Sequence, residues 1–207
     1  MDGVLADSIS SWKSIHDYFG VSNEGSVDEY LRGHIDDLEF IKRDVSLWKQ
    51  NGLYTTRGVL ENILFTIPLM NGAEECLSFL RNHNIRTAIV SAGLDILAEK
   101  VAEDLGIDYA YANGVKLDKT GRLTGEGLLQ VQLIYKDKNV KQLAHELGIP
   151  LNKCAAIGNS CFDIPMFETA GLGIAFNPED DCVKESADII VPGKDLRKLI
   201  PVLHPYI

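Results

Sequence analysis

The chain contains 207 residues with 20 Lys and Arg against 30 Asp and Glu, so its formal net charge is −10. This length fits one large domain, or one domain with an insertion, and 45% apolar residues suffice for a hydrophobic core, which excludes a disordered or fibrous chain. The acidic balance, with no basic patch to offset it, disfavours nucleic-acid and membrane partners. The sequence has neither an apolar stretch of about 18 residues nor a signal-like N-terminus, so we expect a cytoplasmic protein.

Residues 9 to about 68 carry helical periodicity without a convincing strand. Two sets of apolar residues each share one helical face. These sets are Ile9, Trp12, Ile15 and Phe19, followed by Leu38, Ile41, Val45 and Trp48. We therefore predict a helical unit over residues 9–69, with both tryptophans in its core.

From about residue 70 onward, helical segments alternate with short apolar runs, the pattern of a parallel sheet covered by helices. A turn signature at Asp118–Gly121 predicts a small hairpin at the sheet's edge. The sequence thus favours a three-layer α/β core formed by residues 1–8 and 70–207 and interrupted by the helical unit. The expected helices are about 73–80, 94–105 and 139–147, and the expected strands are 86–90, 107–112, 154–157, 172–176 and 188–191.

The four cysteines have neither CxxC spacing nor paired histidines, which argues against a zinc site or a disulfide framework. We predict that Cys76, Cys154, Cys161 and Cys182 are reduced thiols. The acidic clusters 36–37 and 179–181 are expected to be solvated.

Polar groups follow the apolar runs where ligands bind in open α/β sheets, at the carboxyl ends of the strands. An acid, a hydroxyl beside exposed amides, a lysine and an acid/amide pair four residues apart would together bind a phosphate and a hard divalent cation. These groups are Asp2, the Ser91-Ala92-Gly93 turn, Lys136 or Lys138, and Asn159 with Asp163.

This ordered set resembles the haloacid dehalogenase superfamily, and within it the phosphoserine phosphatase-like branch with an inserted helical cap. The resemblance covers nearly the whole chain, and its most specific stretches are residues 1–5, 88–95, 108–113 with 123–125, and 158–167 with 170–171 and 174–176. It implies a Rossmann-like core and an Mg²⁺-dependent phosphatase that hydrolyses a small phosphomonoester through an aspartyl phosphate.

The resemblance also implies roles for individual residues. Asp2 matches the general acid and belongs to the metal site, and Lys136 matches the lysine that neutralises phosphate charge, with Lys138 as the alternative. The phosphate clamp corresponds to Ser91 with the amides of Ala92 and Gly93, together with Gly3. The remaining metal ligands correspond to Asn159 and Asp163.

Three departures from the pattern affect the chemistry. The nucleophilic aspartate belongs two positions before Asp2, ahead of Met1, so we expect a longer natural chain and an impaired enzyme without that segment. Asn159 stands where the family places a metal-ligating aspartate, and the loss of one negative charge should weaken metal binding more than tenfold, since a unit charge pair at about 4 Å is worth roughly 4 kcal/mol before solvation is discounted. Phe162 replaces an asparagine beside the metal site.

The cap differs as well. Ile9 occupies the position of the branch's substrate-binding glutamate, and Asp44 falls where its arginine is expected. The resemblance therefore supports a phosphatase more than phosphoserine as its substrate. A catalytically silent phosphate-binding or regulatory protein and a phosphotransferase remain alternatives, and the sequence leaves open a monomer or a homodimer.

Overall fold

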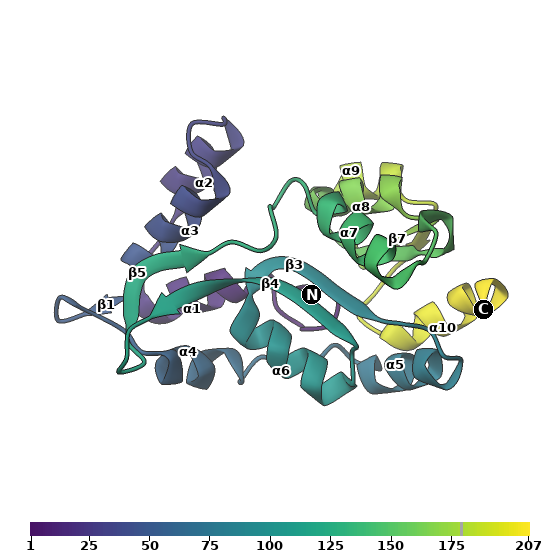
Figure 1. Cartoon of the computed structure of the whole chain (residues 1–207), viewed down its shortest axis with the longest axis horizontal. Coiled ribbons are helices and arrows are strands. Elements are labelled where there is room, and N and C mark those ends of the chain that lie inside the picture. Colours follow the sequence, from purple (N-terminus) through teal and green to yellow (C-terminus); the bar gives the residue numbers. More distant parts are fainter. Residues whose placement is uncertain (179) are drawn as a thin grey trace.

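Two three-stranded sheets form the centre of the chain, of which this computed structural model describes residues 1–178 and 180–207 (Figure 1). The first sheet has the order β3-β4-β5 and the second has the order β6-β7-β8. The strands are β3 (Ala88–Leu94), β4 (Tyr109–Leu117), β5 (Leu123–Leu128), β6 (Ala155–Gly158), β7 (Leu172–Phe176) and β8 (Ile189–Val191).

Parallel pairing dominates both sheets. β3 pairs with β4 in parallel, and β7 lies between β6 and β8 with both pairings parallel. All five residues of β7 are buried, as expected for a strand covered on both faces. β5 runs antiparallel to β4 after the turn predicted at 118–121. The predicted α/β class is confirmed.

Helices of the C-terminal part follow the predicted alternation with the strands. α6 packs on β3 and β4, and α7 and α8 pack on each other (Figure 1). α6 and α7 end at Gly106 and Gly148, whose φ of 65° favours glycine. The helices are α5 (Ala73–Asn82), α6 (Asp95–Leu105), α7 (Asp137–Leu147), α8 (Ile164–Thr169), α9 (Asp181–Ser186) and α10 (Leu199–Leu203), with 3-10 turns at Leu151–Lys153, Cys161–Asp163, Leu196–Lys198 and His204–Tyr206.

The segment before residue 70 is helical, as predicted, but it also contains a hairpin of two short strands with two residues each. Its elements are α1 (Ser11–Phe19), α2 (Glu24–Leu31), α3 (Asp37–Ser46), β1 (Lys49–Gln50), β2 (Leu53–Tyr54) and α4 (Arg57–Leu64). Asn51 and Gly52 join the two strands with φ of 51° and 77°. An Asn-Gly pair favours such a turn, so the expectation of no strand here was wrong: the turn sequence outweighs the surrounding helical periodicity.

Aromatic and aliphatic side chains join the helical segment to the rest. Trp48, Ile15, Leu60 and Leu64 are fully buried and belong to the same core cluster as Leu94 of β3. α3 also packs against β5. Of the apolar faces predicted for this segment, Ile15, Ile41, Val45 and Trp48 are buried in the core, whereas Ile9 and Leu38 are 71% and 44% exposed. No helix in the described part of the chain is long and apolar enough to cross a membrane.

Two predictions about polar residues were wrong. Asp37 is buried rather than solvated, because it accepts hydrogen bonds from the Tyr30 hydroxyl and the Leu133 amide. Cys161 and Cys182 are joined as a disulfide, with Cα atoms 5.8 Å apart, whereas Cys76 and Cys154 are free. The fold brings together two residues 21 positions apart, which spacing rules do not detect. The acidic residue at 179 lies outside the described residues.

Thiol counting checks the cysteine pairing. We expect two reactive thiols per chain in denaturant without reductant, from Cys76 and Cys154, and four after reduction. Cys76→Ser should lower the first count to one and leave the difference between the two counts unchanged. Four reactive thiols before reduction, in protein prepared under oxidising conditions, would contradict the disulfide.

Asp95, the first residue of α6, should make stability depend on pH. Burial raises the pKa of its carboxyl to about 6. The native state therefore binds more protons than the unfolded state between pH 4 and 6, and stability falls as the pH rises through this window. After discounting for partial solvation, Asp95→Asn should gain about 1 kcal/mol in the free energy of unfolding at pH 7 and little at pH 4.

Urea unfolding at the two pH values measures this difference. Asp108→Asn is the opposite control: the hydrogen bond from the Thr87 amide, followed by Arg86, lowers the pKa of Asp108. Its substitution should therefore cost stability at pH 7. An equal gain for Asp95→Asn at both pH values would rule out the proposed ionisation.

Candidate functional site

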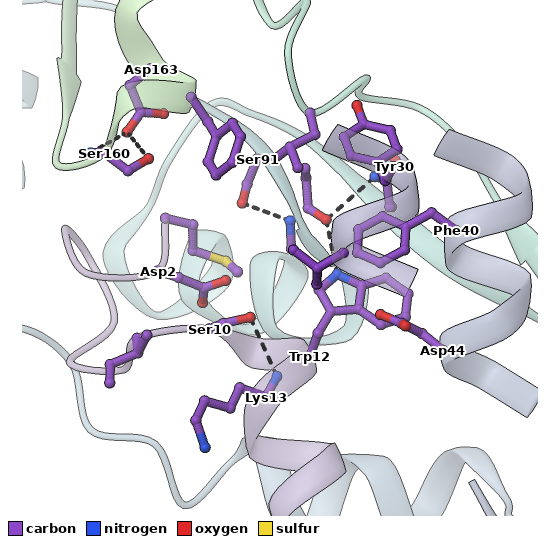
Figure 2. Close-up of a pocket in the computed structure, with 18 of the residues that line it drawn as sticks. Asp2, Ser10, Trp12, Lys13, Tyr30, Phe40, Asp44, Ser91, Ser160 and Asp163 are labelled. Carbon is purple, nitrogen blue, oxygen red and sulfur yellow. Dashed lines mark hydrogen bonds between the residues drawn. The ribbon is translucent and has the colours of Figure 1, made fainter. Parts of the chain in front are cut away.

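A cavity of about 720 Å³ lies between the helical segment and the ends of the strands. Its walls come from the N-terminal residues, α1, α2, α3, the end of β3, and the loops that precede α7 and follow β6. Figure 2 shows Trp12, Tyr30, Phe40 and Asp44 grouped on one side of this pocket and Ser160 and Asp163 on the other. Most of the site residues predicted from the sequence line it: Asp2, Ser91, Ala92, Gly93, Lys136, Asn159 and Asp163.

Asp2 is held in place by a turn of the N-terminal residues. The Met1 carbonyl accepts hydrogen bonds from the amides of Val4, Leu5 and Ala6 at 3.1, 2.8 and 3.2 Å. Oδ2 of Asp2 accepts a hydrogen bond from the Ser11 hydroxyl at 3.0 Å, whereas the buried Oδ1 has no hydrogen-bond partner. Asp2 therefore presents one free carboxylate oxygen in a buried setting.

The Ser91-Ala92-Gly93 segment forms an irregularity within β3. Regular pairing with β4 stops at Val90 and resumes at Leu94. The sequence predicted that the strand ends here, whereas β3 continues through a bulge, a feature often found beside active sites. Ser91 is 5% exposed, and its hydroxyl accepts a hydrogen bond from the Gly93 amide at 3.0 Å.

Gly93 allows Asp2 to approach β3 closely. A Cβ atom at position 93 would lie 2.6 Å from Oδ2 of Asp2 and 2.8 Å from the Ser11 hydroxyl. Gly3 likewise allows a close approach, in this case to Asn159. Its φ is +71°, and a Cβ atom there would collide with the Asn159 amide group. Gly3 thus lies against Asn159 and supports the site through its backbone.

Lys136 and Asp163 form a buried ion pair. The Lys136 ammonium donates to Oδ1 of Asp163 at 2.7 Å, and the residues are 8% and 6% exposed. Oδ2 of Asp163 accepts from the amides of Asn159 and Ser160 at 2.9 and 3.2 Å. Burial raises the pKa of Asp163, but Lys136 and the backbone amides outweigh it, so the pKa is lowered overall and the carboxylate stays charged.

Lys138, the alternative to Lys136, points elsewhere. Its ammonium donates to Oε1 of Gln132 at 2.6 Å and lies 4.4 Å from the ring centroid of Tyr135. The structure therefore brings Lys136, and not Lys138, to the acids of the pocket.

The oxygen atoms around Asp2 suit a hard divalent cation. Oδ1 of Asp2 is a buried oxygen without a partner, and such an atom needs a proton or a cation. Asn159 is 7% exposed and lines the same pocket. Both oxygens of Asp163 already have partners, whereas Oδ1 of Asp2 remains available for a proton or a cation. Asp163 instead organises Lys136 and the 159–160 amides.

Three residues outside the predicted set hold the site together. Ser11, fully buried, donates to Asp2 and accepts from the Leu94 amide at 2.9 Å. The Asn113 side chain accepts from the Gln130 and Val131 amides at 2.9 Å each and donates to the Ala92 carbonyl at 3.3 Å. Asn113 therefore ties the bulge of β3 to the loop that leads to Lys136.

Trp12 forms the third link. Its indole Nε1 donates to the Ala92 carbonyl at 2.9 Å, and its ring centroid lies 5.3 Å from that of Trp48. Helical periodicity predicted both tryptophans as core residues, but Trp12 also lines the pocket. The contacts of these three residues cross 9 to 83 positions of sequence, and no local pattern indicates them.

Residues 38–168 match the haloacid dehalogenase-like hydrolase family. The chain is 35% identical over 173 residues to a phosphoserine phosphatase of Methanocaldococcus jannaschii, covering 83% of this chain and 79% of that protein. It is 34% identical over 177 residues to a phosphoserine phosphatase of Lactococcus lactis, covering 84% and 77%.

A solved structure of a substrate-bound phosphoserine phosphatase complex superposes with a TM-score of 0.82 at 31% identity, covering 98% of this chain and 94% of that one. The expected family is thereby confirmed. The chain belongs to the haloacid dehalogenase-like hydrolases, in the branch of the phosphoserine phosphatases.

Proposed function

We propose that this chain is the scaffold of an Mg²⁺-dependent phosphatase acting on a small phosphomonoester, with residues 9–69 as a cap over a core of 1–8 and 70–207. The observation that carries the proposal is the buried Lys136–Asp163 ion pair, which lines the same cavity as Asp2 and Ser91. A single cavity therefore holds a cation for phosphate, a hydroxyl donor and an acid.

Each residue has a distinct part in this proposal. The Lys136 ammonium, held by Asp163, offsets the charge of the phosphate oxygens, and the Ser91 hydroxyl with the Ala92 amide binds one of them. The Gly93 amide, expected from the sequence to join this clamp, instead donates to the Ser91 hydroxyl. Asp2 protonates the leaving oxygen, with Ser11 fixing its orientation. Trp12 and the cap keep water from the reacting phosphate.

Asn159 and the main-chain carbonyl of Asp2 would hold the Mg²⁺ ion, with Asp163 supporting the loop, so that the Asp2 carboxyl stays free to carry the proton that it gives to the leaving oxygen. When bound, the ion would polarise the phosphate and offset its negative charge. Asn159 contributes an uncharged oxygen, so metal affinity should rise at least tenfold in Asn159→Asp, as measured by calorimetric titration with Mg²⁺. No change in affinity would remove Asn159 from the metal site.

In this mechanism the attacking carboxylate would belong to an aspartate two positions before Asp2 and would form an aspartyl phosphate that water then hydrolyses. We therefore expect phosphate release from an aryl phosphate to depend on an aspartate at that position. The test adds a short apolar N-terminal strand that ends in aspartate and combines it with Asn159→Asp.

Phosphate release should appear in this extended chain and be absent from a matched extension ending in asparagine. If both extended chains are inert although they fold and bind Mg²⁺, the phosphatase proposal fails. A catalytically silent phosphate-binding role is the second candidate, favoured by the uncharged Asn159. It predicts that the extended chain binds inorganic phosphate without hydrolysing any ester.

A further inference from the structure

The cap side of the cavity contains a buried acid whose charge has no cationic partner. Asp44 of α3 lines the cavity and is 3% exposed. Both of its carboxylate oxygens lie 3.0 Å from the Asn23 amide nitrogen, and Oδ2 lies 3.3 Å from Nε2 of His16. An amide donor satisfies hydrogen bonds but does not neutralise a charge, so the charge of Asp44 depends on the state of His16.

The hydrogen bonds around His16 identify it as neutral. Nδ1 accepts a hydrogen bond from the Trp48 indole at 2.9 Å, so Nδ1 carries no proton. The single ring proton therefore sits on Nε2, the tautomer that this network assigns. Nε2 is buried and has no partner of hydrogen-bond geometry. His16 therefore leaves the charge of Asp44 in place, and the site retains an unused donor.

No lysine or arginine in the described ranges 1–178 and 180–207 lies within 4.0 Å of Asp44. The nearby cations have other partners: Arg43 pairs with Glu29 at 2.7 Å and with Glu39 at 3.0 Å, and Lys13 pairs with Asp17 at 2.7 Å. A buried carboxylate without a counter-ion is costly, and a ligand that brings a positive charge removes this cost.

The surroundings of Asp44 favour an organic cation. Trp12, Tyr30 and Phe40 line the same side of the pocket, and the rings of Tyr30 and Phe40 are stacked with centroids 5.1 Å apart (Figure 2). Aromatic faces attract ammonium groups. A second buried acid, Asp37, also lines the cavity. Together these groups repel a carboxylate and attract an amine.

We propose that the substrate is an aminoalkyl phosphate monoester without a carboxylate, with its ammonium group at Asp44 and its phosphate at Lys136 and Ser91. The inference rests on the proposed function, because that function places phosphate at the opposite side of the cavity. The acid on the cap side and the lysine on the core side then match the two charges of one small zwitterion.

Binding measurements on the 207-residue chain test this proposal without turnover. Calorimetry compares O-phosphoethanolamine with ethyl phosphate, which lacks only the amine, and with O-phosphoserine, which adds a carboxylate. We expect O-phosphoethanolamine to bind on the order of tenfold more tightly than either. In Asp44→Asn the ratio between O-phosphoethanolamine and ethyl phosphate should fall to about one, because the paired charge is gone.

Glu39→Gln is the matched control, because it removes one negative charge from the exposed, Arg43-paired face of the same helix. In this variant the ratio of the affinities for O-phosphoethanolamine and ethyl phosphate should equal that of the unsubstituted chain. Equal binding of ethyl phosphate and O-phosphoethanolamine, or tighter binding of O-phosphoserine, overturns the proposal while leaving the phosphate site intact. If inorganic phosphate and all three esters fail to bind, the proposed function falls as well. The comparison within the unsubstituted chain decides the question even if Asp44→Asn does not fold.

Discussion

Lys136→Met is expected to lower the free energy of unfolding by about 3 kcal/mol at pH 7, because it leaves the carboxylate of Asp163 buried without its cation. The two side chains are only 10% and 8% exposed, so water compensates only partly for the lost partner. The same substitution should abolish the measured affinity for phosphate. Urea unfolding followed by circular dichroism, with phosphate titration of the folded variant, measures both effects.

The loss of stability in Lys136→Met should depend on Asp163. In the double variant Lys136→Met with Asp163→Asn, most of the lost stability should return, because no unpaired charge remains in the core. Because the folded-state pKa of Asp163 is lowered, the stabilisation by the pair is present above pH 3.8 and is lost as the pH falls through that lowered pKa.

Lys13→Met is the control for the side-chain change itself. It breaks an ion pair of the same 2.7 Å length, but with side chains 56% and 63% exposed, and should cost less than about 0.5 kcal/mol. A loss of stability in Lys136→Met no larger than in this control would contradict a buried, functional ion pair.

Gly171→Ala is expected to cost about 3 kcal/mol, because the new methyl group would meet backbone and not a movable side chain. The Cβ atom would lie 2.6 and 2.7 Å from the carbonyl carbon and Cα of Asn152, and closer still to its carbonyl oxygen. The Gly171 amide donates to the Leu151 and Cys154 carbonyls at 2.9 Å each, which holds it in this position. Thermal unfolding measures the loss.

Gly58→Ala provides the matched control. Gly58 lies inside α4, and a Cβ atom there meets nothing within 4 Å. Alanine is the better helix former, so this change should raise stability by about 0.5 to 1 kcal/mol. If both alanine variants change stability in the same direction, the close approach of Gly171 to residue 152 does not constrain the fold.

The alternation of helices and strands after residue 70 was predictable because it depends on local periodicity. β7 has the predicted bounds of 172–176, and α6 ends at Gly106 as its left-handed conformation demands. The β1–β2 hairpin also depends on a local signal, its Asn-Gly turn, but the two-residue strands are too short to interrupt the helical periodicity on either side. The burial of Asp37 was missed for another reason: its partner Leu133 is 96 residues away.

Sequence alone, through the order of its motifs, determined the α/β class, the family and the small set of polar residues at the strand ends. Those conclusions depend only on the types of the residues and on their order along the chain. Tertiary structure decided which of these residues meet: Lys136 rather than Lys138 at Asp163, and Ser11 and Asn113 as supports. It also decided that Asp44 is buried beside a neutral His16, because burial and tautomer depend on neighbours from distant segments.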